Sequence, residues 1–324
     1  MKSMNNRKKE VLDVLVVVDG RPGHEKQSFG IIKALGNRVK VNTFVVDISK
    51  KKFFQQLKSY GTFFFSLPPG EITLPDHADL VIGTGTRTHS TVLNLKKYFK
   101  IPAVTCMTPS LHFRKYFDVC FVPEHDNCTA RANYFFTYGA PNTSTDKRKH
   151  SEEKGLIVLG GVDAKSHDWN HKDITDKITK IIFTEKNIQW IVSSSPRTPA
   201  PTAAVLAEIA RTADNAEFFD YKDTAKGWIE EQYDSCARVW VTTDSISMLY
   251  EALSSGCRVY VLTMPWKDGG NKFKKNEELL IKKGLVTPYS SWEKGKVDQS
   301  INTIKLNEAQ RCADHILQTC WQEN

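Results

Sequence analysis

VTTDSISMLYEALSSGCRVYVL, residues 241–262, is the stretch that decides the fold class. An apolar strand pattern ends in two threonines, a polar turn with Asp244, Ser245 and Ser247 follows, and a helical pattern then runs to a glycine before a second apolar strand. A strand–helix–strand unit predicts a parallel sheet with helices packed on its faces. The unpaired amides at the start of such a helix suit a pyrophosphate, and an acid one turn inside, Glu251, suits a ribose diol.

The same alternation of apolar runs and helical patterns extends outward from this stretch. Strands are expected nearby at 156–160, 188–193, 216–219, 238–242 and 258–262, and helices at 171–184, 201–213, 224–235 and 246–254. The first half repeats the rhythm, with strands at 13–18, 41–47, 79–83, 102–107, 117–122 and 134–138, and helices at 25–36 and 89–98. A polar, charged segment at 140–155 separates the halves and is typical of a linker.

Two α/β domains in series therefore follow from the pattern. We expect an N-terminal Rossmann-like domain over 1–145, a C-terminal one over 155–304, and a closing segment, 305–324, that carries a helix at about 306–321. Ligands of open parallel sheets bind at the carboxyl ends of the strands. With two such domains, the natural site is the cleft between them.

Composition narrows the possible partners and the compartment. The chain of 324 residues holds 45 Lys and Arg against 37 Asp and Glu, a net charge of +8, which favours anionic partners. Seven cysteines without a CxxC pair predict a reducing compartment, so we expect a cytoplasmic protein, at most peripheral on the inner face of the membrane. No apolar stretch approaches the roughly 20 residues that a membrane span needs.

The first loop of the N-terminal domain, residues 20–24, offers a catalytic group. The spacing of its glycines is not that of the G-x-G-x-x-G dinucleotide fingerprint. His24 is the preferred general base because an imidazole titrates near neutrality, although the sequence also allows a surface histidine at a helix start. Glu25 and Glu124 are the alternative catalytic acids or bases. We expect the acceptor to be contacted by Gly20, Arg21, Gly23, Arg87 and His89, although plain helix capping is an alternative for the last two.

Glycine, hydroxyl and basic residues that suit a phosphorylated ligand gather in the C-terminal domain. Backbone amides of a glycine loop face phosphate in many sites, and an arginine clamps a diphosphate through two hydrogen bonds. The predicted donor-binding residues are Gly160, Gly161, Arg197, Ser245, Ser247, Glu251 and Lys272. No D-x-D pair and no zinc spacing occur, so we expect no metal, and we expect no cofactor.

The sequence also resembles known proteins. The stretch at 241–262 is similar to the donor-sugar motif of GT-B glycosyltransferases. Together with DGRPGHEKQSFGIIKAL, FDVCFVPEHD and SSSPRTP, in this order, it resembles the GT-B-like family named for its plant mitochondrial-fission member, whose bacterial members include outer-core lipooligosaccharide glycosyltransferases. The resemblance covers roughly 13–290. It implies a GT-B fold, with the last helix packing back on the N-terminal domain, and sugar transfer, but it fixes neither donor nor acceptor.

Three hypotheses for the function remain open at this stage. The first is a metal-independent GT-B glycosyltransferase that moves a sugar from a nucleotide-activated donor to a glycolipid or surface-glycan acceptor, without nucleic acid as a partner. The second is a nucleotide-sugar 2-epimerase, for which acids such as Glu124 would act around the donor sugar. The third is a non-catalytic protein that acts through a surface at a membrane, against which the donor motif with Glu251 argues. The fold alone does not decide among them.

Overall fold

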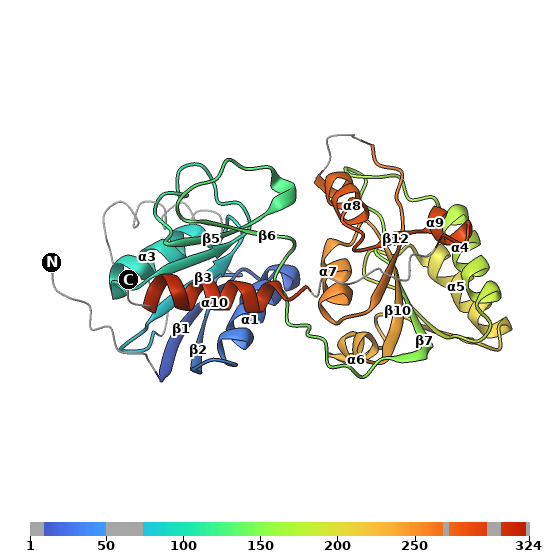
Figure 1. Ribbon diagram of the computed structural model, residues 1–324, viewed down its shortest axis with the longest axis horizontal. Helices are drawn as coiled ribbons and strands as arrows, with labels where there is room; N and C mark the ends of the chain where they lie inside the picture. Colours follow the sequence, from blue (N-terminus) through green and yellow to red (C-terminus); the bar gives the residue numbers. More distant parts are fainter. Residues whose placement is uncertain (1–9, 50–73, 268–271, 297–305, 322–324) are drawn as a thin grey trace. The chain divides into compact units, whose positions relative to one another are not determined.

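The computed structural model describes residues 10–49, 74–267, 272–296 and 306–321. The chain forms two compact units: the first comprises Met1–Thr143 and Asn307–Asn324, and the second Ser144–Leu306. Each unit is built on a six-stranded parallel sheet with helices, as Figure 1 shows. The expected α/β class with two Rossmann-like sheets is confirmed.

The sheet of the first unit has the strand order β2-β1-β3-β4-β5-β6, and all its pairs are parallel. Its strands are β1 (Val11–Val18), β2 (Lys40–Asp47), β3 (Leu80–Thr84), β4 (Ala103–Cys106), β5 (Val119–Pro123) and β6 (Tyr134–Thr137). Its helices are α1 (Pro22–Leu35), α3 (His89–Phe99), the 3₁₀ helix η1 (Glu124–Asp126) and α10 (Glu308–Trp321). The central strands are buried on both faces, which is why they read as continuous Val and Ile runs.

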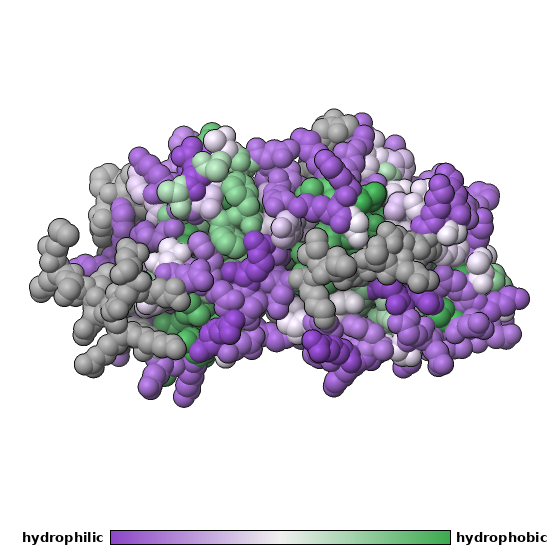
Figure 2. All heavy atoms as spheres, viewed as in Figure 1, coloured by the Kyte–Doolittle hydropathy of each residue, from purple (hydrophilic) through white to green (hydrophobic). Residues whose placement is uncertain are grey.

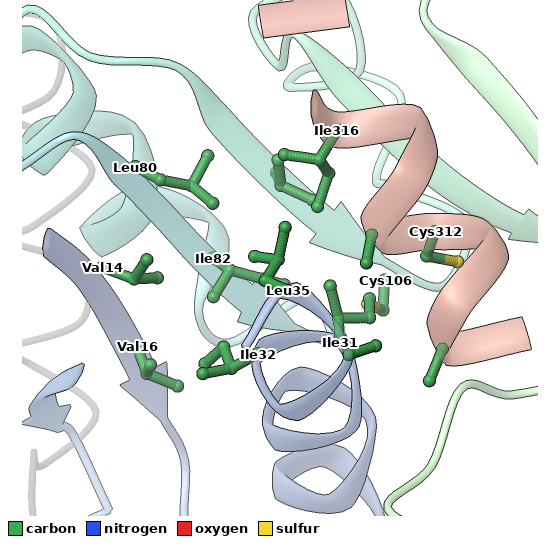
Figure 3. Packing of buried hydrophobic residues seen from close by; sticks show 14 of the residues in the cluster. Val14, Val16, Ile31, Ile32, Leu35, Leu80, Ile82, Cys106, Cys312 and Ile316 are labelled. Atoms are coloured by element: carbon green, nitrogen blue, oxygen red, sulfur yellow. The ribbon is translucent and has the colours of Figure 1, made fainter. Parts of the chain in front are cut away.

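The last helix completes the core of the first unit. On one face of the sheet, Ile31 and Leu35 of α1 pack with Cys312 and Ile316 of α10 above the buried side chains of β1 and β3, as Figure 3 shows. At the surface, Arg38 Nε donates to Asp314 Oδ1 at 3.0 Å. The other face of the sheet carries a separate cluster that includes residues of α3.

The second unit repeats the architecture with the strand order β12-β11-β10-β7-β8-β9. Its strands are β7 (Ser151–Val158), β8 (Gln189–Ser193), β9 (Ala216–Phe219), β10 (Cys236–Thr242), β11 (Arg258–Leu262) and β12 (Thr287–Pro288). Its helices are α4 (His171–Thr184), α5 (Ala200–Thr212), α6 (Trp228–Ser235), α7 (Ile246–Ser254), α8 (Lys272–Lys282) and α9 (Tyr289–Glu293). Isoleucines of α4 pack on the sheet with Trp190 and Trp240.

The expected linker at 140–155 is partly wrong. Residues 151–155 form the first half of β7, where Ser151 pairs with Cys236 and Gly155 with Trp190. This half of the strand is mostly exposed, so its polar side chains hide the strand pattern. Gly155 is also required for packing, since a Cβ there would lie 2.3 Å from the Trp190 ring. The sequence pattern also missed α8, α9 and β12.

Among the described residues, no helix is both long enough and apolar enough to cross a membrane. The face drawn in Figure 2 is mostly hydrophilic, and apolar residues gather on it in separate patches.

Candidate functional site

A buried carboxylate and an imidazole meet at the carboxyl end of β1 in the first unit. Asp19 directly follows β1 and is 3% exposed. His24 lies in the first turn of α1, and its Nδ1 is 3.2 Å from Asp19 Oδ2. The second carboxylate oxygen of Asp19 accepts the Arg21 amide at 3.3 Å. The turn between strand and helix thus folds around the carboxylate and fixes its direction toward the imidazole.

The imidazole of His24 rests against the glycine that follows β3. Gly85 has a φ of 82°, and a Cβ added to it would lie 2.5 Å from His24 Cε1. Only glycine takes this backbone conformation without strain and also leaves the ring its place. Because β1 and β3 are parallel neighbours, the loops that follow them both start at the carboxyl end of the sheet. Two strands of the sheet therefore position the His24 ring.

This pair of side chains has a definite proton-transfer chemistry. A carboxylate that accepts Nδ1–H selects the tautomer in which Nε2 carries the lone pair, and it stabilises the imidazolium that forms when Nε2 takes a proton. The side chain of His24 is 18% exposed and that of Asp19 is fully buried. The carboxylate therefore orients the imidazole, and the role of His24 as a general base stays a prediction.

Packing within the protein explains one of the two glycines of this loop. Gly20 has a φ of 79°, and a Cβ there would lie 2.8 Å from the Cβ of Ser49, so packing and backbone conformation require it. Among the described residues, no atom lies within 4 Å of a Cβ added to Gly23, so packing against them does not require this glycine, and its contact with the acceptor stays a prediction. The loop arginine, Arg21, is exposed and its Nε lies 3.8 Å from Asp19 Oδ2.

The other predicted residues of the first unit are not all brought together with His24. Glu25 is the acid of the first turn of α1, where its charge complements the helix dipole. Arg87 is half-buried in the loop before α3. Glu124 begins η1, directly after β5. Burial raises the pKa of Glu308, and the nearby charge of Glu124 raises it further. The catalytic role of Glu124 stays a prediction.

His89 has the surroundings of a core residue. It is 1% exposed, and its ring makes edge contacts with Phe113 and Phe117 at centroid distances of 6.2 and 5.2 Å. Its Nδ1 lies 3.3 Å from Ser110 Oγ. Burial lowers the pKa of His89 to about 4. The side chain is enclosed by the protein, which argues against the acceptor contact expected from the sequence.

In the second unit, a cavity of about 490 Å³ opens at the N-terminus of α7. It is lined by Val162, Asp163, Arg197, Asp244, Ser245, Ile246, Ser247 and Phe273. Ser245 holds the N-cap position of α7 but makes no capping hydrogen bond with its side chain. The first amides of a helix have no acceptor within it, so the cavity receives the positive end of the α7 dipole.

Asp244 and Arg197 form an ion pair in the wall of this cavity. Arg197 Nη2 lies 2.8 Å from Asp244 Oδ2, and the Arg197 side chain is 41% exposed while that of Asp244 is 1% exposed. Arg197 Nη1 also donates to the Gly161 carbonyl at 3.3 Å. These contacts direct the guanidinium along the cavity wall.

The two glycine amides expected to face a phosphate are engaged inside the protein. Gly160 N–H donates to Thr242 Oγ1 at 2.7 Å, and Gly161 N–H donates to Asp244 Oδ2 at 3.0 Å. Both glycines are required by close packing, since a Cβ on Gly161 would lie 1.9 Å from the Arg197 carbonyl oxygen. They shape the cavity wall, and in this arrangement they do not present free donors to a ligand.

The remaining predicted donor-binding residues differ in exposure. Ser247 is exposed on the first turn of α7 and lines the cavity. Glu251 lies further along α7, is 4% exposed and is not among the lining residues. Lys272 begins α8, and its side chain lies outside the described residues. Phe273, next to it, stacks on Trp266 with an interplanar angle of 8° and gives the cavity an aromatic wall.

One group of metal-ligand type occurs among the described residues. Ligand atoms of Asp13, His77 and Asp79 lie within 4.8 Å of one another. Asp79 already contacts His77 Nε2 at 2.8 Å and accepts the Asp13 amide at 3.1 Å. Asp79 precedes β3, whereas Asp19 follows β1, so this group lies at the amino ends of the strands, away from His24. Its hydrogen bonds explain the cluster without an ion.

Comparison with known proteins places this geometry in a family. The family model described as mitochondrial fission ELM1 matches residues 22–320. The chain belongs to the mitochondrial fission ELM1 family. The matched part of this ELM1 family chain includes both His24 and the whole lining of the α7 cavity. A comparison with curated proteins finds no match.

Solved structures similar to this ELM1 family chain share its fold. The S. aureus MnaA–UDP co-structure has a TM-score of 0.57 and 14% identity, over 95% of this chain and 96% of that chain. UDP-GlcNAc 2-epimerase from Neisseria meningitidis bound to UDP-GlcNAc has a TM-score of 0.52 and 13% identity, over 95% and 99%. The glycotransferase of kitacinnamycin has a TM-score of 0.51 and 11% identity, over 96% and 100%. The GT-B fold expected from the sequence is thereby confirmed.

Two residues of these sites were missed by reasoning from the sequence. Asp19 stands at the carboxyl end of an expected strand, five positions before His24, and this position at the ligand-binding end of a strand is the signal for it in the sequence. Asp244 was expected only as part of the polar turn before a helix, and nothing in the sequence shows that its carboxylate contacts Gly161 and Arg197.

Proposed function

We propose that this protein transfers a sugar from a nucleotide-activated donor to a hydroxyl group of a glycan or glycolipid. In this proposal the second unit binds the donor and the first unit binds the acceptor. The observation that carries the proposal is the Asp19–His24 pair, because it is an oriented base at the ligand-binding edge of a parallel sheet. The similarity of the fold to nucleotide-sugar enzymes is consistent with this activity.

The α7 cavity supports the donor side of the proposal. The helix N-terminus, the exposed part of Arg197 and the Ser247 hydroxyl provide positive charge and hydrogen-bond donors for a diphosphate. Phe273 provides an aromatic surface for a base. Glu251 is proposed to reach the ribose diol, and this contact requires a change in its buried surroundings.

The chemical step follows from these roles. His24 Nε2 takes the proton of the acceptor hydroxyl while the hydroxyl oxygen attacks the anomeric carbon of the donor. The bond between that carbon and the β-phosphate oxygen breaks, and the nucleoside diphosphate leaves with the bonding electron pair. Asp19 stabilises the imidazolium, and the charge at the cavity stabilises the departing diphosphate. Glu25 and Glu124 are the next candidates for the base.

The acceptor is proposed to lie in an anionic surface, reached from the cytoplasm. The net charge of +8 favours association with acidic lipids or an acidic glycolipid. Binding to vesicles with and without anionic lipid, at low and high salt, measures this association directly.

A thermal-shift screen of nucleotides and nucleotide sugars tests donor binding. A ligand at 100 times its dissociation constant adds about 2.7 kcal/mol to the free energy of unfolding. Glu251→Ala is expected to weaken the binding of the nucleotide found by about 1–3 kcal/mol, the cost of a charged hydrogen bond. If no nucleotide stabilises the wild type, the protein acts through a surface and the proposal fails.

Variants of the first unit test the transfer step. His24→Ala and Asp19→Asn are expected to lower the transfer rate by about 10²–10⁴-fold, the usual contribution of a general base, while nucleotide affinity is unchanged. His112→Ala, at an exposed histidine of the same unit, is the matched control. Full activity of His24→Ala sinks the assigned role. If the wild type converts the donor sugar to its 2-epimer in the absence of an acceptor, the protein is an epimerase and the proposal of sugar transfer is wrong.

A further inference from the structure

Asp244 places a buried negative charge in the wall of the cavity at the N-terminus of α7. Its Oδ2 holds the Gly161 amide and the Arg197 guanidinium, at 3.0 and 2.8 Å. Its Oδ1 is buried and has no hydrogen-bond partner in the part of the chain that the structure describes. Gly160 gives the carboxylate its place, because a Cβ there would lie 2.1 Å from Oδ2. The surrounding backbone is thus shaped to keep this charge in the cavity wall.

A fixed carboxylate opposes any anion that enters the cavity. A glycine-loop amide and an arginine are both usual phosphate ligands, and Asp244 engages one of each. Water screens this charge weakly because the side chain is 1% exposed. The repulsion therefore depends strongly on how many negative charges the ligand brings.

The charge of the ligand changes in the proposed reaction. In a nucleotide sugar, the β-phosphate is a diester and has one ionisable oxygen. Transfer breaks the bond to the anomeric carbon, and the released diphosphate ends in a phosphate whose second ionisation has a pKa of about 6. At pH 7.5 the product therefore carries nearly one negative charge more than the donor.

We propose that Asp244 is a specificity-determining residue that favours the nucleotide sugar over the nucleoside diphosphate, and so favours release of the product. This inference rests on the proposed function. Arg197 and the α7 N-terminus attract the additional charge of the product, and Asp244 opposes that attraction. A purely structural role for Asp244 would change the affinity for both ligands by the same factor.

Calorimetric titration of the full chain at pH 7.5 tests the inference with three probes: UDP, UDP-GlcNAc and the β-methyl ester of UDP. The methyl ester removes the additional charge without adding a sugar. In Asp244→Asn, the ratio of UDP affinity to methyl-ester affinity is expected to rise about tenfold over that of the wild type, the effect of removing one partly screened charge at a few ångströms.

A matched control removes another carboxylate of the same cavity. Asp163 also lines the cavity, and the hydrogen bond from the Lys165 amide helps to hold its pKa below the usual range. Asp163 is only half-buried, so water screens its charge better than that of Asp244. Asp163→Asn is therefore expected to change the preference between the two ligands less than threefold. Asp244→Glu keeps the charge and is expected to keep the preference.

Each outcome decides one of the two proposals. If no probe binds the wild type, the proposed function and this inference both fail. If Asp244→Asn keeps the wild-type ratio of UDP affinity to methyl-ester affinity, the inference alone is wrong. Asp244→Ser removes the same charge with a smaller side chain, and an unchanged ratio in that variant overturns the inference if Asp244→Asn does not fold.

Discussion

His24 and His89 show how surroundings decide what an imidazole does. His24 is partly exposed and oriented by a buried carboxylate, whereas His89 is enclosed by two phenylalanines. The sequence places both after apolar strands and cannot separate them, because the side chains that enclose His89 come from residues 113 and 117, in a different loop. The partly exposed imidazole and the enclosed one are distinguished only by tertiary contacts.

Burial of His89 makes the stability of the protein depend on pH. Its pKa is lowered from 6.5 to about 4, so the unfolded chain binds the proton first as the pH falls. Stability is therefore complete above pH 6.5 and is lost as the pH falls toward 4. We expect a loss of about 2 kcal/mol between pH 7.5 and 5 from this group.

Urea unfolding of the wild type and His89→Leu at the two pH values measures this contribution. The variant is expected to show a smaller loss at pH 5, while His112→Ala, at an exposed histidine, keeps the loss of the wild type. An equal loss in wild type and His89→Leu contradicts the assignment.

At the scale of single elements, the turn after β3 supports the first turn of α1. Gly85→Ala is expected to destabilise the protein by about 1–3 kcal/mol, because alanine is strained at a positive φ and its Cβ occupies the place of the His24 ring. Transfer activity is expected to fall with it. Chemical denaturation and initial rates measure the two effects.

Gly23→Ala is the control from the opposite side of this contact. It lies in the first turn of α1, and no atom of the described residues lies within 4 Å of an added Cβ, so alanine is expected to be neutral or to add up to about 1 kcal/mol. If Gly23→Ala loses as much stability as Gly85→Ala, the contact between Gly85 and His24 is not the cause of the loss in Gly85→Ala.

Elements were predicted well from the sequence where both faces of a strand are buried, as in β1 and β3, because continuous apolar runs are hard to mistake. The first half of β7 escaped because its side chains face water while its backbone pairs with β8 and β10. The contacts within the site loops were predicted only in part, because a contact such as Asp244–Arg197 joins residues that lie far apart in the sequence.

At the scale of the whole molecule, the first unit is assembled from the two ends of the chain. The apolar face of α10, with Cys312 and Ile316, fills the core beside α1. We expect a fragment of residues 144–306 to unfold cooperatively, while a fragment of residues 1–143 aggregates or stays unfolded unless residues 307–324 are supplied. Circular dichroism and calorimetry of the fragments measure this difference.

A milder variant tests the same dependence in the intact chain. Ile316→Ala removes a fully buried side chain and is expected to cost about 2–5 kcal/mol, whereas Phe183→Ala, at an exposed position of α4, is expected to cost less than about 0.5 kcal/mol. A cooperative, stable fragment of residues 1–143 disproves the dependence on α10.

The return of α10 also orders events on the ribosome. Residues 1–143 are made before the second unit, but the helix that closes their core is made only after it. The second unit can fold while synthesis continues, and the first waits with part of its apolar surface open. Nascent chains stalled before residue 307 should therefore recruit chaperones to residues 1–143, and a stop codon introduced shortly before residue 307 would damage the first unit more than the second.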